Sequence, residues 1–95
     1  MYEVIRRYKG AGAPELMDLL EQNKDEITRL IQGVNGFVSY SLFRTSDGGA
    51  SATICQDQAG VDESVRIARE WVQQNASGAT AVTPEVIEGE VITQF

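Results

Sequence analysis

The side chains best suited to small-molecule chemistry are one tryptophan and three tyrosines spread along the chain. Trp71, Tyr2, Tyr8 and Tyr40 could line a pocket for a flat organic molecule, with the tyrosine hydroxyl groups as hydrogen-bond donors. The alternative is that they pack in the core or at an interface between subunits. We predict Tyr40, Trp71 and Arg6 as ligand-binding residues, and the packing alternative stays open.

Two pairs of like charges could also carry chemistry. Arg6 and Arg7 fall in a segment that we expect at the centre of a sheet, where an unpaired charge is costly. One of them should therefore meet a carboxylate such as Glu90, and a clamp for a substrate anion is the alternative. Glu88 and Glu90 share one face of the last predicted strand. They could form an acid and base pair or a divalent-metal site, but a charged sheet edge is the simpler interpretation.

The composition excludes several kinds of active site. The chain has no histidine, which removes Ser-His-Asp and Cys-His nucleophiles, imidazole-bound zinc and an axial histidine for haem. A single cysteine, Cys55, cannot form a thiolate cluster, and in mid-strand without a histidine we predict it to be a small core residue. We predict no metal and no cofactor, and we leave open whether the protein is an enzyme.

The glycine-containing motifs are interpreted as turns and caps. GVNG at 33–36 matches the GxxG of an RNA-binding KH clamp, but that clamp needs a basic setting between two helices. Here the motif joins a predicted helix to a strand in an acidic protein, so we expect Gly33 to cap the helix in the left-handed conformation. Gly48 and Gly49 join two strands, which indicates a tight hairpin turn with positive φ and not a phosphate-binding loop.

Length and charge limit the organisation of the chain and its partners. Ninety-five residues can build one core but not two, so we predict a single domain over residues 1–95. Eight basic against 14 acidic residues give a net charge of −6, which repels nucleic acid and anionic membranes. Charges interrupt the N-terminal apolar residues before a signal peptide or membrane span could form. We expect a cytoplasmic protein with no nucleic-acid or membrane partner.

Hydrophobic periodicity divides the chain into six elements. The predicted strands are 2–9, 37–43, 50–56 and 85–95, and the predicted helices are 14–32 and 61–75. The first helix rests on apolar residues that recur at three-and-four spacing after Pro14. The order βαββαβ predicts a ferredoxin-like α+β fold, with a four-stranded antiparallel sheet, the first and third strands in its centre, and two helices on one face.

The predicted strands carry apolar residues on both faces of the sheet. One parity contains Tyr2, Val4, Tyr8, Val38, Tyr40, Leu42 and Ile54, and the other contains Ile5, Phe37, Phe43 and Cys55. Two helices can cover only one face, so the other would be an exposed apolar patch unless another subunit covers it. We predict a homodimer formed through this sheet face, since an isologous two-fold pair is the commonest arrangement.

The element order and several short segments resemble the dimeric α/β-barrel superfamily. GFVSY at 36–40, after a long helix and before a Gly-Gly hairpin, is similar to the antibiotic-biosynthesis-monooxygenase-like proteins. VIRRYKG, DQAGVDES and PEVIEGEV, which begin at residues 4, 57 and 84, resemble an uncharacterised bacterial branch. The resemblance implies two sheets paired into a barrel, with a ligand held between sheet and helices. Characterised members include cofactor-free oxygenases of aromatic polyketides, haem-degrading enzymes and small isomerases.

The resemblance carries over architecture but not catalytic residues. Several oxygenases of the group have a tryptophan just after the third strand and a histidine along the second helix. In this chain the segment after the third predicted strand is CQDQ at 55–58, which has no tryptophan, and the second predicted helix has no histidine. Trp71 lies too far along the chain to correspond to that tryptophan. Two hypotheses therefore remain. The protein binds a small apolar or aromatic molecule between sheet and helices, with cofactor-free oxygenase or isomerase chemistry, or it is a non-enzymatic dimerisation or accessory module without a small-molecule site.

Overall fold

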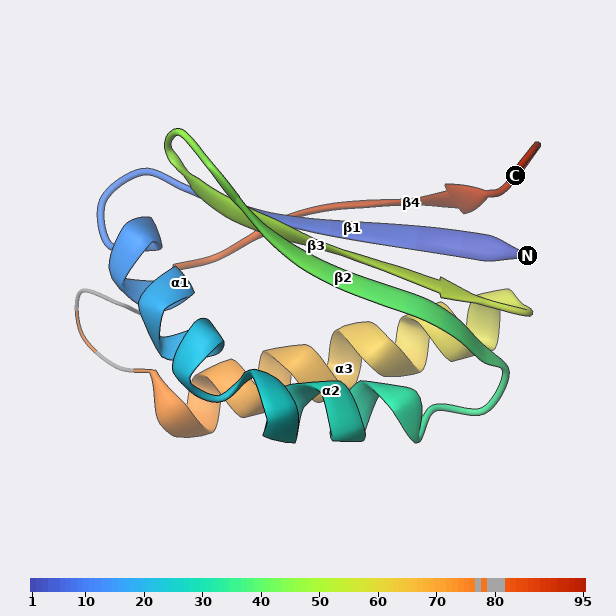
Figure 1. The fold of residues 1–95 in the computed structure, drawn as a ribbon, viewed down its shortest axis with the longest axis horizontal. Coiled ribbons are helices and arrows are strands. Elements are labelled where there is room, and N and C mark those ends of the chain that lie inside the picture. Colours follow the sequence, from blue (N-terminus) through green and yellow to red (C-terminus); the bar gives the residue numbers. More distant parts are fainter. Residues whose placement is uncertain (77, 79–81) are drawn as a thin grey trace.

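The computed structural model of the chain describes residues 1–76, 78 and 82–95 (Figure 1). Its elements are β1 (Tyr2–Lys9), α1 (Ala13–Gln22), α2 (Lys24–Gln32), β2 (Phe37–Thr45), β3 (Gly48–Cys55), α3 (Gln58–Asn75) and β4 (Glu85–Glu90). The strands form one antiparallel sheet in the order β2-β3-β1-β4. The helices lie together on one side of it, and the described residues leave the opposite side uncovered. The predicted ferredoxin-like fold, with the first and third strands at its centre, is confirmed.

The first predicted helix is in fact two helices that meet at Asn23. The backbone of Asn23 leaves the helical region, with φ −116° and ψ 21°. Its side-chain amide donates to the Leu19 carbonyl at 2.9 Å, an example of a short polar side chain competing with the backbone hydrogen bonds of a helix. The break redirects the chain, so that α1 packs on β3 whereas α2 packs on β2 and α3.

The expected left-handed cap at Gly33 is wrong. Gly33 is right-handed, with φ −74°, and its N–H donates to the Arg29 carbonyl at 3.2 Å. The positive φ occurs at Gly36, where it is 79° and where the chain turns into β2. A hydrogen bond from the Val34 N–H to the Ile31 carbonyl adds a further right-handed turn after the helix. The positive φ therefore occurs three residues later than the sequence pattern indicates.

Two other boundaries differ from the predicted ones for identifiable reasons. Helix α3 begins at Gln58, before the predicted start at 61, because the Asp57 carboxylate caps it by accepting from the Gly60 N–H at 3.0 Å. Strand β4 ends at Glu90 instead of residue 95 because Glu90 lies opposite Tyr2, the first residue of β1. Beyond that point only Met1 remains as a partner, and its carbonyl accepts from the Val91 N–H.

The strand register decides which side chains face the helices. Val4 pairs with Thr53, so the even residues of β1 share a face with the odd residues of β3. Cys55 therefore lies in the core with Val4, and Ile54 faces the uncovered side, which reverses the predicted placement of both residues. The assignment of Cys55 as a core residue is nevertheless confirmed.

A bulge in β2 changes the side on which Phe37 lies. Phe37 pairs with Cys55 and Ser39 with Ile54, so Val38 is the extra residue between them. Phe37 consequently packs against the same helix-covered core as Tyr40 and Leu42, although simple alternation predicts the opposite face.

None of the described helices is both long and apolar enough to cross a lipid bilayer.

The hairpin glycine Gly48 gives the first testable prediction. Its φ is 156°, and a Cβ placed there would collide with the Tyr8 carbonyl oxygen and lie 2.8 Å from the Ala13 Cβ. We expect Gly48→Ala to lower the free energy of unfolding by about 1–3 kcal/mol, the usual cost of overpacking. Gly89→Ala is the matched control, because a Cβ there meets nothing within 4 Å. Urea denaturation that gave equal stabilities for the two variants would contradict this account.

Candidate functional site

A small cavity of about 20 Å³ lies between the sheet and the helices. Its lining residues are Arg6, Tyr8, Leu20, Ile27, Tyr40, Leu42, Ser51, Ala68, Trp71 and Val72. The three predicted ligand-binding residues thus come together here from β1, β2 and α3. The space itself is only about large enough for one water molecule.

Strand pairing positions the polar lining of this internal cavity. Arg6 and Tyr8 follow each other on the inward face of β1, and Ser51 lies opposite Arg6 on β3. Trp71 is held from the helix side, because its indole N–H donates to the Glu26 carboxylate at 3.0 Å and so links α3 to α2. The aromatic groups are therefore fixed by separate elements around a shared space.

Arg6 is a buried cation. The residue is only 6% exposed, and its Nε has no hydrogen-bond partner among the described residues. Burial lowers the pKa of the guanidinium, an effect opposed by the nearby Tyr8 and Tyr40. The guanidinium carbon lies 5.4 Å from the centroid of the Tyr8 ring, within the range of a cation–π contact.

One arginine of β1 meets a carboxylate, as predicted, but the pair is Arg7 with Asp47 and does not involve Glu90. Glu90 lies opposite Tyr2, at the far end of the strand, and the β4 residue opposite Arg6 is the apolar Val86. Arg7 points to the uncovered side and pairs with Asp47 of the hairpin turn at 3.2 Å. The inward-facing arginine is therefore left without a carboxylate partner in the described part of the chain.

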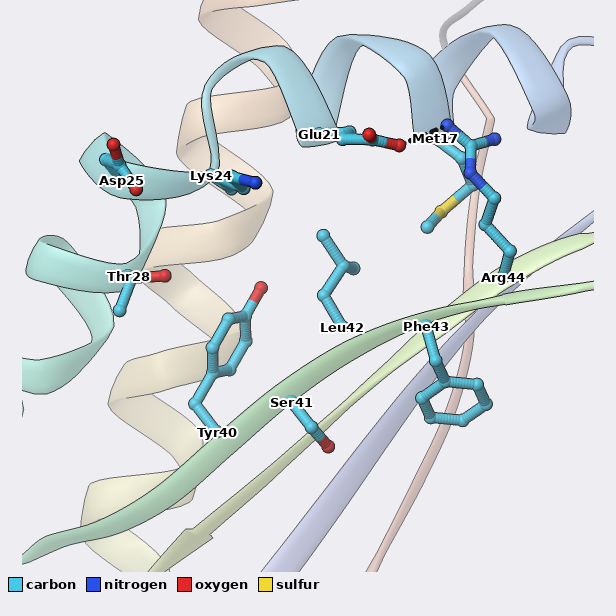
Figure 2. A pocket seen from close by; sticks show the side chains of 10 residues that line it. All are labelled: Met17, Glu21, Lys24, Asp25, Thr28, Tyr40, Ser41, Leu42, Phe43 and Arg44. Carbon is cyan, nitrogen blue, oxygen red and sulfur yellow. Dashed lines mark hydrogen bonds and ion pairs between the residues drawn. The ribbon is translucent and has the colours of Figure 1, made fainter.

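Tyr40 connects the internal cavity to an outer pocket of about 390 Å³ between β2 and the first two helices. We call this the β2-side pocket, and Figure 2 shows the Tyr40 ring and the Thr28 hydroxyl pointing into it. Phe43 points to the other side of the strand. Burial and the neighbouring Tyr8 raise the pKa of Tyr40 to about 12, so its hydroxyl remains a proton donor at neutral pH.

A salt bridge closes one end of the β2-side pocket. Arg44 reaches from β2 to Asp18 and Glu21 of α1, with N–O distances of 2.8 Å to each carboxylate. These hydrogen bonds raise the pKa of the guanidinium. The β2-side pocket is therefore lined mainly by polar and charged groups, and Tyr40 and Leu42 border it on the side of the internal cavity.

A third space of about 340 Å³ opens on the opposite side of the internal cavity. This α3-side pocket is lined by Arg6, Arg69, Val72, Gln73, Ala76, Val82, Thr83 and Pro84. It shares Arg6 and Val72 with the internal cavity, as the β2-side pocket shares Tyr40 and Leu42. The internal cavity therefore adjoins both outer pockets.

Ser51 and Arg69 are the lining residues that sequence reasoning missed. Arg69 follows Val65 by four residues and precedes Val72 by three, so helical spacing places it beside the inward stripe of α3. Ser51 can be identified as a lining residue only when the strand register is known, because the register places it opposite Arg6.

The other candidate groups from the sequence lie elsewhere. Burial raises the pKa of the Cys55 thiol, so this thiol stays protonated and is a weak nucleophile. Glu88 lies on the edge strand β4 and accepts a hydrogen bond from Gln58 at 3.2 Å. Within residues 1–76, 78 and 82–95, no group of three or more histidine, cysteine, aspartate or glutamate side chains could hold a metal ion.

Comparison with solved structures supports the fold assignment. No protein-family model matches the sequence, and no curated protein matches it at a significant level. A protein of unknown function from Nitrosomonas europaea, NE2512, superposes with a TM-score of 0.70 at 14% identity, covering 99% of this chain and 90% of that one. A variant of MhuD with two manganese protoporphyrin IX molecules per active site gives 0.67 at 15% identity, covering 99% and 96%.

SnoaB, a cofactor-independent oxygenase from Streptomyces nogalater, gives a TM-score of 0.65 at 18% identity, covering 98% of this chain and 94% of that one. Identities this low establish a common fold and no shared activity. The chain therefore has the fold of the antibiotic-biosynthesis-monooxygenase-like proteins, as the resemblance in the sequence predicts.

The raised pKa of Tyr40 predicts how stability changes with alkaline pH. The folded state keeps the phenol neutral up to about pH 12, whereas an unperturbed tyrosine ionises near 10. Tyr40 therefore stabilises the fold fully below pH 10, and this contribution is lost as the pH rises towards 12. We expect the wild type to lose stability relative to Tyr40→Phe across this window in urea denaturation. Parallel pH profiles for the two proteins would show that the pKa is not raised.

Proposed function

We propose that this protein binds a small aromatic molecule in the layer between its sheet and its helices. The observation that carries the proposal is that Arg6, Tyr40 and Trp71 all border the internal cavity, which shares Tyr40 with the β2-side pocket and Arg6 with the α3-side pocket. Ligand sites are typically concave and largely apolar, with a few convergent polar groups, and this layer offers a phenol, a guanidinium and a serine hydroxyl among aliphatic and aromatic walls.

The sizes of the spaces indicate how a ligand would enter. The internal cavity of about 20 Å³ cannot accept an aromatic ring as it stands, but the β2-side pocket of about 390 Å³ can. A flat molecule would occupy that pocket and reach the interior by displacing the side chains of Tyr40 and Leu42, which border both spaces. Tyr40 is thus a residue whose hydroxyl a ligand would meet on its way from the β2-side pocket to the interior.

Cofactor-free oxygenation is the chemistry that we propose for such a ligand. A phenolic ring with a C–H para to its hydroxyl can react with O₂ to give the quinone and water, with one oxygen atom retained on the ring. The ring supplies the electrons, so no metal or flavin is needed. Arg6 would stabilise the reactive phenolate, since a buried cation favours the anionic form of a neighbouring acid, and Tyr40 would orient the ring oxygen. SnoaB, with the same fold, is a cofactor-independent oxygenase.

A ligand panel tests the proposal. Hydroxylated aromatics and quinones should raise the melting temperature and quench the fluorescence of Trp71, which borders the internal cavity. Tyr40→Phe should weaken this response by about fivefold or more, the loss of one buried hydrogen bond. Tyr2→Phe is the matched control, because Tyr2 packs against the separate cluster of Val4, Val34, Cys55 and Val61. A panel without any shift or quenching would leave the accessory-module hypothesis in its place.

We further propose that a second copy of the chain covers the open face of the sheet. Ile5 and Ile54 lie on this face near its centre, and Ile87 and Phe43 are 57% and 46% exposed towards its margins. These apolar side chains on an uncovered sheet face favour self-association by an isologous contact, and they are also the specific feature that supports a dimerisation module as the second candidate function.

The dimer has its own test. Ile87→Lys would bury two charges at a two-fold interface, so we expect light scattering at micromolar concentration to shift from the dimer mass to the monomer mass of 10.4 kDa. Leu30→Lys is the control, because Leu30 is 44% exposed but lies on α2, on the other side of the sheet. A wild-type protein that is already monomeric would refute the proposed interface.

A further inference from the structure

We propose that the α3-side pocket binds an organic carboxylate, a molecule with an apolar body and one carboxyl group that is received by Arg6 and Arg69. This inference rests on the proposed function, because it concerns a ligand bound in the same layer between sheet and helices. It adds that the ligand is negatively charged and that it enters by the α3-side pocket. It differs in naming a separate pocket, which shares Arg6 but is not lined by Tyr40 or Trp71, so the two proposals can be tested apart.

The first step is the missing counter-ion of Arg6. An arginine keeps its charge at any physiological pH, so its burial beside apolar residues costs several kcal/mol unless an anion compensates it. The chain has 14 acidic residues, yet strand register places Val86 and Ser51 beside Arg6. Since the described part of the chain supplies no carboxylate there, a bound ligand is the remaining source of one.

The second step is a second cation in the same pocket. Arg69 of α3 also lines it and is close enough to lower the pKa of the Arg6 guanidinium. Its neighbour on the helix, Glu70, is engaged by Arg66, which pairs with Glu63 as well. Arg69 is exposed to solvent, so an anion in this pocket would meet one buried and one accessible guanidinium and would offset their mutual repulsion.

The third step is the shape and chemistry of the anion. The buried Nε of Arg6 has no hydrogen-bond partner among the described residues, and the residue lines this pocket. Two nitrogens of one guanidinium can hold the two oxygens of a carboxylate. The rest of the wall is largely aliphatic, with Val72, Ala76 and Val82. A volume of about 340 Å³ accommodates one or two fused rings. A small inorganic anion would leave this apolar wall uncovered.

The test compares 1-naphthoate with 1-naphthamide, which has the same shape without the charge. Isothermal titration of the wild-type protein should show that naphthoate binds about tenfold or more tightly than the amide, and that sulfate does not compete. Arg69→Gln should weaken naphthoate binding severalfold. Arg29→Gln removes the same charge from an exposed position on α2 and should leave it unchanged.

A volume-conserving variant keeps the proposal falsifiable. Arg6→Met should abolish the preference for naphthoate and raise the melting temperature of the free protein, because an apolar side chain replaces an uncompensated buried charge. A variant that melts lower, or that keeps the preference for naphthoate, would overturn the assignment of Arg6.

The outcomes separate this inference from the proposed function. Equal binding of acid and amide, with a response that depends on Tyr40, would overturn the carboxylate site and support the aromatic site at the β2-side pocket. Naphthoate binding that depends on Arg6 and Arg69 and is indifferent to Tyr40→Phe would support the carboxylate site as a pocket separate from the one that Tyr40 lines. Binding of neither compound would overturn the carboxylate site.

Discussion

Strand β1 is hydrogen-bonded along both of its edges, to β3 on one side and to β4 on the other. This double pairing fixes its register, and in a strand of period two the register fixes the face of every side chain. Val4, Arg6 and Tyr8 must therefore point at the helices together. A register slip of one residue would expose the core residues Val4 and Tyr8. Their burial therefore stabilises a register that also buries the charge of Arg6.

The arrangement of the helices follows from the same layer. The break at Asn23 allows two short helices to follow the curved sheet where one straight helix would diverge from it. Close packing is interrupted at two places. The β2-side pocket, next to Tyr40, is bordered by α1 and α2. The α3-side pocket, next to Arg6, is bordered by the end of α3 and the residues just before β4. The pockets are thus a consequence of three helices covering four strands incompletely.

Electrostatics distinguish the two pockets. On the β2 side, Arg44 is neutralised by two carboxylates of α1, so this rim holds a salt bridge and the floor offers phenolic hydrogen bonding. On the α3 side, the buried Nε of Arg6 has no partner among the described residues, and the exposed Arg69 lines the same largely apolar pocket. A molecule with an aromatic body and an acidic oxygen would satisfy both sides of the layer, which is the physical link between the two proposals.

The sequence alone determined the order of the elements, the central strands and the need to cover two apolar sheet faces, because these follow from local periodicity. Sequence reasoning also named Arg6, Tyr40 and Trp71 as candidate ligand-binding residues, and these three border one internal cavity. Only the tertiary structure decided that Arg6 lies opposite Val86 and far from Glu90, that the bulge at Val38 turns Phe37 inward, and that Arg69 joins Arg6. Those outcomes depend on register and on packing between distant segments, and a pattern read along one strand or one helix contains no information about its neighbour.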